Sequence, residues 1–260
     1  MDLLNIQYNE IKIFLFILIR VGVILFLMPF FNSRIIPVPV KAGLTIILAM
    51  ILFPVSGPYT GVYPDTTWGM FGLIIGELIT GMILGLMTQF FFEGIRMMGQ
   101  IAGMEIGFSI ANVLDPQSGF QTSILSNIAY LLAIVLFLIL NGHYIILNAI
   151  RESFAIIQPG SVHLTQQVFK EMLHRSGEMF VIAIQIGAPV ISAILFIQLA
   201  FGLITRLLPQ MNVMVVAFPL QIVTGLIFFG ISLWVMLHFI EKYVQTLDRQ
   251  LINMMYFLRG

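Results

Sequence analysis

The chain has 260 residues, of which 59% are hydrophobic and 9% are charged. Soluble domains usually carry about 25% charged residues, so this composition excludes an ordinary soluble enzyme and places most of the chain in lipid or against other apolar helices. Twelve Lys and Arg residues balance twelve Asp and Glu residues, which leaves no basic field to attract nucleic acid. Disulfides and thiolate metal sites are excluded because the chain has no cysteine.

Polar residues divide the chain into apolar blocks, which lie in order at 13–31, 42–53, 69–92, 101–114, 124–140, 179–204 and 213–239. The first block is too long for the core of a signal peptide and no cleavage pattern follows it, so we expect it to be retained. A helix needs roughly 20 residues to cross a bilayer, and blocks 42–53 and 101–114 are shorter than that. The pattern predicts an all-α membrane protein with about six helices.

Two ionisable residues lie inside apolar blocks, Arg20 in the first and Glu77 in the third. A charge at the centre of a bilayer costs roughly 2.5–3.5 kcal/mol, and such charges usually pair. We therefore expect Arg20, Glu77 and Arg206 to be charges that contact neighbouring subunits, although Glu77 could instead bind a proton. Short apolar blocks and internal charges are typical of a protein enclosed by partners, and also of a transporter with broken helices.

Glycines recur at helical spacing along the middle of the chain. Gly72 and Gly76 fall on one helix face, and Gly81 and Gly85 fall on roughly the opposite face. A second series of glycines, at spacing four, begins with Gly99 and Gly103. Small residues at this spacing let helices pack closely in apolar surroundings, so the pattern predicts tight helix packing. The alternative is that glycine is simply frequent in membrane helices.

The segment 106–122 combines helix-breaking residues with apolar side chains. Pro116 pushes Asp115 out of the helical region, and the glycines at 107 and 119 loosen the backbone. Between them lie the apolar residues Phe108, Ile110 and Val113. An apolar loop at membrane depth is tolerated only where protein buries it or where it lines a cavity. The alternative is a plain connector between two helices.

The carboxy-terminal stretch predicts a long helix, because no Gly or Pro occurs between Ile231 and Arg259. Beyond Phe239 its apolar residues recur at spacings of three and four, at Val244, Leu247, Leu251, Met254, Met255 and Leu258. This face predicts either contact with a partner in a complex or a helix lying on the lipid surface.

Catalytic and metal-binding patterns are not evident in the sequence. The four histidines are scattered without an HExxH motif or an acidic cluster, so we expect no metal and no cofactor. Ser109 and His143 come nearest to a catalytic pair, and neither has a third partner. The chain is therefore predicted not to be an enzyme.

Four stretches in order, Arg20–Leu44, Ile106–Gln117, Leu136–Leu147 and Gly202–Ile222, closely resemble the FliR family. That family is a membrane component of the flagellar type III protein export gate. The resemblance covers essentially the whole chain and implies a subunit of a helical gate, present as one copy together with FliP, FliQ and FlhB. Unfolded flagellar subunits would pass through this gate in the bacterial inner membrane, at the flagellar basal body.

The resemblance also implies a division of the chain and a role for its central loop. Residues 1–177 would form a FliP-like helical region that includes a plug loop at 106–122, and residues 178–260 a FliQ-like helical hairpin with an amphipathic extension. In this family the matching loop lies across the pore, where apolar side chains seal by excluding water. We expect the seal to come from Phe108, Ile110 and Val113, with Gly107, Asp115, Pro116 and Gly119 shaping the loop.

Two alternatives to the flagellar gate remain open at the level of the sequence. Virulence injectisomes use homologous gates, so the chain could be an injectisome counterpart. A multi-span transporter working alone is less favoured, because such proteins usually contain an internal repeat and a polar site near the bilayer midplane. The sequence contains no visible repeat and no polar cluster beyond the isolated Arg20 and Glu77.

Overall fold

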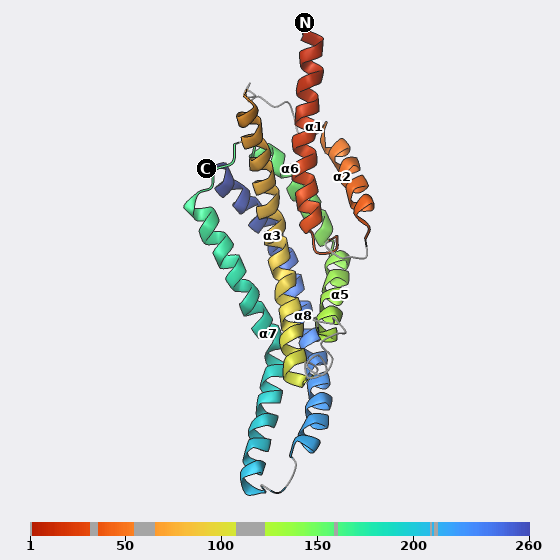
Figure 1. The fold of residues 1–260 in the computed structure, drawn as a ribbon, viewed down its shortest axis with the longest axis vertical. Helices are drawn as coiled ribbons and strands as arrows, with labels where there is room; N and C mark the ends of the chain where they lie inside the picture. The colour runs from red at the N-terminus through yellow and green to blue at the C-terminus, as the bar shows by residue number, and fades with distance from the viewer. Residues whose placement is uncertain are drawn as a thin grey trace. The chain divides into compact units, whose positions relative to one another are not determined.

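A computed structural model describes residues 2–31, 36–54, 66–107, 123–158, 161–208, 210 and 213–260. All regular secondary structure within these ranges is helical, which confirms the predicted all-α class. The helices, drawn in Figure 1, are α1 (Asp2–Leu27), α2 (Val38–Leu52), α3 (Thr67–Ile106), α5 (Ile124–Ile139), α6 (Gly142–Ile156), α7 (Gln166–Leu207) and α8 (Val213–Arg259).

Helix α3 differs from the sequence-based expectation, because the apolar block 69–92 and residues 101–106 of the next block belong to one helix of 40 residues, Thr67–Ile106. Glu93 and Arg96 separate the two blocks in hydropathy, but charged residues are good helix formers and do not interrupt the backbone. Helix α6 was not expected as a separate apolar block. It begins after Asn141, whose positive φ of 59° ends α5 and turns the chain.

The chain forms two compact units. Unit 1 contains Met1–Phe90, Asn141–Ser176 and Val244–Gly260, and unit 2 contains Phe91–Leu140 and Gly177–Tyr243. Helices α3, α7 and α8 are each divided between the units, with one part in unit 1 and the other part in unit 2. The expected division at residue 177 rests on likeness to FliP and FliQ rather than on contacts within the chain, and it stays a prediction.

Unit 1 is built around α1, which lies beside α2 (Figure 1). One stripe of α1 is buried at helical spacing and consists of Phe16, Ile17, Arg20, Val21, Ile24 and Leu25, and Met28 directly after the helix is buried as well. Helix α6 buries a matching stripe that includes Ile146, Ile150 and Phe154. The core of unit 1 is therefore mostly apolar, and its buried polar residues are Arg20, Glu77 and Ser153, together with Lys41, Thr45, Thr80 and Thr88.

The carboxy-terminal part of α8 also packs in unit 1. All six apolar residues of its amphipathic stretch, from Val244 to Leu258, are buried. Leu251 lies against Ile24 of α1, Leu84 of α3 and Ile146 of α6 around one small cavity. The expectation that this face contacts a partner or lipid is therefore wrong, because the chain covers the face itself.

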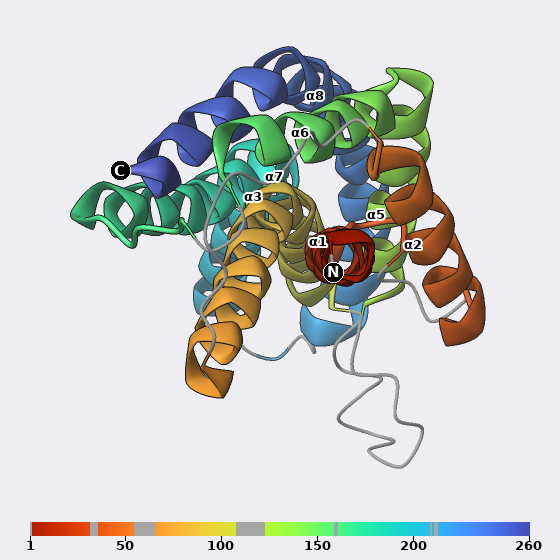
Figure 2. The same ribbon diagram turned by 90° about the horizontal axis from the view of Figure 1, so that it is seen from above.

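The end of α8 is fixed by hydrogen bonds to the segment that precedes α7, close to the chain terminus in Figure 2. The His163 N–H donates to the Leu258 carbonyl at 2.8 Å, and the Thr165 hydroxyl donates to the Phe257 carbonyl at 3.1 Å. The last carbonyls of a helix have no partner within it, so these bonds satisfy groups that would otherwise need water.

Unit 2 has an aromatic core centred on Phe92 of α3. Its ring meets Tyr130 and Phe137 of α5 edge-on, with centroids 6.4 and 5.2 Å apart. Phe91 stacks on Tyr243 of α8 at 3.9 Å. Offset and edge-on aromatic pairs contribute about 0.5–1.5 kcal/mol beyond area burial, so this cluster joins three helices. Helices α7 and α8 run antiparallel in this unit as a hairpin (Figure 1).

Three helices of the described residues, α3, α7 and α8, are long and apolar enough to cross a membrane, and a fourth span is possible if α5 and α6 count as one broken helix. The chain buries no more than 39% of the residues in the most apolar stretch of each of the three. Most of this apolar surface therefore needs cover from lipid or from other chains.

Candidate functional site: the buried Arg20 network and the helix contacts

Arg20 and Glu77 form an ion pair inside unit 1, and both side chains have zero exposure. The Arg20 Nε donates to Glu77 Oε2 at 2.6 Å, and Nη2 donates to Oε1 at 2.9 Å. The pair is thus bidentate, which is the strongest geometry for a guanidinium and a carboxylate. Arg20 lies on the buried stripe of α1 and Glu77 on the facing side of α3, so the contact ties these two helices.

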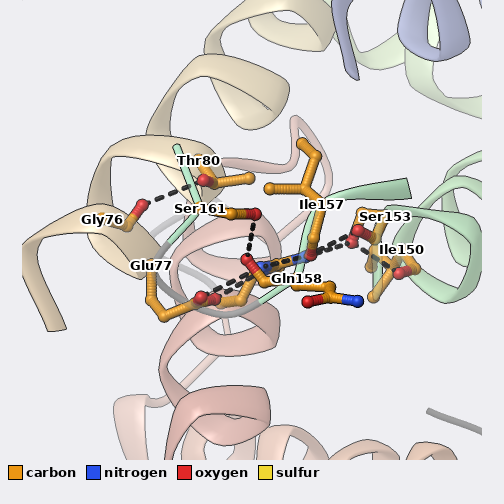
Figure 3. A network of polar contacts seen from close by, with 9 residues as sticks. Gly76, Glu77, Thr80, Ile150, Ser153, Ile157, Gln158 and Ser161 are labelled. Carbon is orange, nitrogen blue, oxygen red and sulfur yellow. Dashed lines mark hydrogen bonds and ion pairs between the residues drawn. The ribbon is translucent and has the colours of Figure 1, made fainter. Parts of the chain in front are cut away.

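Arg20 also binds the end of α6, where Figure 3 labels Ser153 and Ile157. Its Nη1 donates to the Ser153 carbonyl at 2.8 Å, to the Ser153 hydroxyl at 3.2 Å and to the Ile157 carbonyl at 3.2 Å. Nη2 donates to the Ile157 carbonyl as well, at 3.1 Å. Ser153 lies in the last turn of α6, and Ile157 is the residue that follows the helix. The Ser153 carbonyl also accepts from the Ile157 N–H at 2.9 Å, and the positive charge of Arg20 compensates the negative end of the helix dipole.

The arrangement corrects the expectation that Arg20 and Glu77 contact other subunits. Each nitrogen of the guanidinium donates within the chain, and both oxygens of Glu77 accept from it. Sequence reasoning could not pair them, because 57 residues separate them and helix packing alone brings them together. The pair therefore leaves no open polar site of the kind that a stand-alone transporter would need. Its direct effect is to lock α1, α3 and α6 together.

Four of the predicted packing glycines lie at close helix contacts within the chain. A Cβ at Gly81 would lie 2.9 Å from the Val23 Cβ, and one at Gly85 would lie 2.7 Å from the Leu27 Cβ, so both let α3 approach α1. In unit 2, Gly99 faces the backbone of Ser126, and Gly103 faces the Ser123 side chain. Glycine is needed at these positions because a side chain would collide with the neighbouring helix.

Gly72 behaves differently, because a Cβ there would meet nothing within 4 Å. Gly76 is partly buried, and its carbonyl accepts a hydrogen bond from Thr80 at 2.9 Å. Two further contact glycines escaped the sequence pattern: Gly94 faces the Met179 carbonyl, and Gly225 faces the Ile106 side chain. Neither glycine belongs to the series of regularly spaced glycines in the sequence. Their close contacts become evident only when segments that are distant in sequence pack together.

Comparison with known proteins identifies the family. Residues 11–247 match the family described as "Bacterial export proteins, family 1". The flagellar biosynthetic protein FliR of Bacillus subtilis is 31% identical over 82% of this chain and 83% of the relative. The chain belongs to the FliR family of bacterial export proteins. The FliR proteins of Escherichia coli and Pectobacterium carotovorum are 30% and 27% identical, over 80% and 86% of this chain and 79% and 85% of the relatives.

Membership in the FliR family makes this chain a membrane protein of flagellar biosynthesis and protein export. The relatives above are named as flagellar proteins, which favours the flagellar system over the injectisome. The relatives are named flagellar biosynthetic proteins, and the matching family is described as bacterial export proteins, which assigns the chain to a transport apparatus.

Of the predicted plug residues in this FliR-family chain, Gly107 is described. It follows the last residue of α3 with a φ of +96°, and its N–H donates to the Met104 carbonyl at 3.1 Å. A left-handed glycine at this position is a common helix terminator, because residues with a Cβ rarely adopt that conformation. The other predicted plug residues, Phe108, Ile110, Val113, Asp115, Pro116 and Gly119, lie outside the described residues.

Several other charges among the described residues of this FliR-family chain are partly or fully exposed on helices. Glu93 and Arg96 pair at 3.6 Å, with the Arg96 guanidinium 4.0 Å above the Tyr130 ring. Arg206 is exposed at the end of α7. It stays a predicted subunit contact. Within the described ranges, no three His, Asp or Glu side chains are grouped so that they could hold a metal ion.

Proposed function

We propose that this chain is the FliR subunit of the flagellar type III export gate, assembled in the bacterial inner membrane with FliP and FliQ. One copy would complete a closed helical pore through which unfolded flagellar subunits leave the cell, and FlhB would contact its cytoplasmic side. Membership in the export family supports the transport role. The observation that carries the assembly is the apolar surface that the chain leaves uncovered on helices of both units.

The apolar surface of α2 is difficult to reconcile with simple membrane insertion. This helix has 15 residues and spans about 22 Å, which is less than the roughly 30 Å of a bilayer core. Six of its residues nevertheless expose large apolar side chains: Val38, Val40, Ile46, Ile47, Met50 and Ile51. A short apolar helix is stable when neighbouring protein covers it, so this surface favours a partner subunit.

The hairpin of α7 and α8 supports the same conclusion in unit 2. From Met179 to Thr205 and from Val213 to Ile240 neither helix carries a Lys, Arg, Asp or Glu. Large side chains such as Phe196, Leu203 and Trp234 are exposed along the hairpin. Apolar surface of this extent marks a binding face for protein or membrane. A FliQ-like hairpin in a gate would contact neighbouring hairpins through such a surface.

The loop between α3 and α5 completes the proposal. A pore wide enough for an unfolded chain would dissipate the membrane potential unless it were sealed. The apolar residues of 106–122 would provide the seal by excluding water from a constriction. A loop suits this task because displacing it breaks fewer backbone hydrogen bonds than displacing a helix.

Co-expression with FliP and FliQ tests the assembly, and a loop deletion tests the seal. We expect one large stable complex when the three proteins are co-expressed. The chain expressed alone should be unstable in detergent. Deletion of residues 110–117 should make closed complexes conduct ions in a planar bilayer, because the constriction loses its apolar side chains. A stable monomer, or a deletion complex that conducts no more than the wild type, would contradict the proposal.

A further inference from the structure

An apolar groove runs along unit 1 between α1, α2 and α3, where α1 lies between the other two helices (Figure 1). Its volume is about 640 Å³, which lies within the roughly 300–1,000 Å³ of sites that bind small molecules. All of its lining residues except Thr45 are apolar. Four of them, Phe26, Ile46, Leu78 and Met82, are 38–50% exposed, so the groove is open to the surroundings of the chain.

The one polar lining residue does not make the groove polar. The Thr45 hydroxyl donates to the Lys41 carbonyl at 2.8 Å, so it is satisfied within α2. Its methyl group faces α1, because a Cβ at Gly22 would lie 3.3 Å from the Thr45 Cγ2. The lining is therefore apolar along its whole length, and it suits a hydrocarbon chain.

Positive charge lies at one end of this groove. The Lys41 Nζ lies 5.9 Å from the centre of the Phe26 ring, which lines the groove beside Leu27 at the end of α1. Helix α2 begins at Val38, and its first turn contains no acidic residue, so the positive end of the helix dipole lies at the same end. An anionic group is attracted to this end of the groove, because both the ammonium group and the helix dipole favour negative charge.

The length of the groove matches one leaflet of a bilayer. Its lining on α1 extends from Leu18 to Leu27, which is about 14 Å at 1.5 Å per residue. The hydrocarbon core of a bilayer is roughly 30 Å thick, so one leaflet contributes about 15 Å. A groove of this length, with a cation at one end, has the dimensions of the acyl chains and the headgroup of a single phospholipid.

Helix α2 presents different faces to the groove and to the outside. Ala42 and Ile46 line the groove at a spacing of four. Val40, Ile47 and Ile51 recur on the opposite side of the helix, and each is more than half exposed. A partner subunit can therefore cover the outer face of α2 while a lipid fills the groove.

We propose that this groove binds one anionic phospholipid, with its acyl chains along α1, α2 and α3 and its phosphate at Lys41. Basic residues between membrane helices are a recurrent means of holding anionic lipid headgroups. The bound lipid would complete the packing of α2 on α1 and α3. This inference requires only that the chain lies in a membrane, so it goes beyond the proposed gate and does not depend on it.

Photochemical labelling tests the proposal. The probe is phosphatidylglycerol with a photoreactive group on an acyl chain, added to phosphatidylcholine vesicles that hold the full-length chain co-expressed with FliP and FliQ. Mass measurement of digested peptides identifies the labelled residues. We expect labelling within 18–27, 42–46 and 78–86. Photoreactive phosphatidylcholine should label these residues about fivefold less, because one basic residue near an anionic lipid contributes about that factor.

Two substitutions separate the headgroup contact from the groove itself. Lys41→Met should lower labelling by phosphatidylglycerol about fivefold, and Lys41→Arg should preserve it because the charge remains. Ala42→Trp should abolish labelling of the groove by both lipids, because the indole fills the space that the acyl chains need. The control is Gly43→Trp, one residue away, where a Cβ meets nothing within 4 Å, and its labelling should equal that of the wild type.

The contrary outcomes are distinct. Equal labelling by the two lipids, unchanged in Lys41→Met, would overturn the assignment of an anionic headgroup. An unlabelled groove in a sample whose exposed α7 residues are labelled would overturn the lipid site. A cross-link from Ala42→Cys to FliP or FliQ would then show that a partner subunit fills the groove, and the chain has no other cysteine to confuse this result. The gate proposal survives each of these outcomes, because labelling is read on the peptides of this chain.

Discussion

At the scale of single residues, Arg20 shows how a charge is accommodated in an apolar chain. The guanidinium reaches Glu77 and the last turn of α6 at the same time, and the Phe154 ring lies 4.3 Å from its centre. Burial of two charges is expensive, and it is tolerated where the ions are paired and their other hydrogen-bonding groups are satisfied. The network meets this condition, so its removal should affect the packing of three helices.

The first prediction concerns the loss of one partner of this pair. Arg20→Met leaves the Glu77 carboxylate buried without its cation, which typically costs about 3–5 kcal/mol. We expect a large fall in the thermal midpoint of the detergent-solubilised complex with FliP and FliQ. The double variant Arg20→Met with Glu77→Leu should recover part of the loss, because no uncompensated charge remains.

Glu93→Gln is the control, on the helix that also carries Glu77. It breaks the ion pair with Arg96, which is partly exposed and spans 3.6 Å, and such pairs contribute about 1 kcal/mol or less. An Arg20→Met complex as stable as the wild type would mean that the buried pair does not hold α1, α3 and α6 together.

At the scale of elements, the carboxy-terminal part of α8 illustrates how amphipathicity can mislead. Its periodic apolar face was predicted from the sequence and is real. The pattern indicates that the apolar face is covered, but it does not identify the covering surface. A partner protein, a lipid surface and the chain's own core all favour the same spacing of apolar residues. The cover is unit 1, because α1, α3 and α6 present the complementary surface.

A pair of substitutions on this part of α8 tests its packing. Leu251 is 1% exposed and Tyr256 is 54% exposed. Leu251→Ala should destabilise unit 1 by about 2–5 kcal/mol through lost burial and a cavity, and should speed proteolysis of the full-length chain in its complex. Tyr256→Ala should change stability by no more than about 0.5 kcal/mol. If Leu251→Ala left proteolysis unchanged but weakened binding to FliP or FliQ, the face would be an interface after all.

At the scale of the whole molecule, the dominant property is the amount of apolar surface that the chain leaves uncovered. The helices α3, α7 and α8 are long and apolar enough to span a membrane, and each buries only a minority of its most apolar stretch. A chain of this kind is stable only in an apolar environment. Lipid provides such an environment without specific contacts, whereas other subunits provide it through specific contacts. If the proposed gate forms, part of this apolar surface should bind other subunits specifically and not only contact lipid.

Phe196 of α7 offers a test, because it is 70% exposed and no charge lies nearby on its helix. Phe196→Ser should leave insertion and accumulation in the membrane unchanged, and should lower the yield of the complex with FliP and FliQ, because an apolar contact between subunits is lost. The readout is the amount of complex by native mass measurement. Gln198→Ser, also exposed and two residues away, is the control. Full yield of the Phe196→Ser complex would place this residue against lipid.

The sequence by itself predicted the helical class and most glycine contacts of α3, because composition, periodicity and small-residue spacing are local properties of the chain. The export family followed from the resemblance of four stretches to known proteins. It also predicted that Gly107 loosens the backbone, and α3 ends directly before this residue, which has a positive φ. Only the tertiary structure decided the partner of Arg20, the cover over the end of α8 and the contact between Gly225 and Ile106. Each of these joins segments that are far apart in sequence, and periodicity marks a face as buried without identifying the surface that buries it.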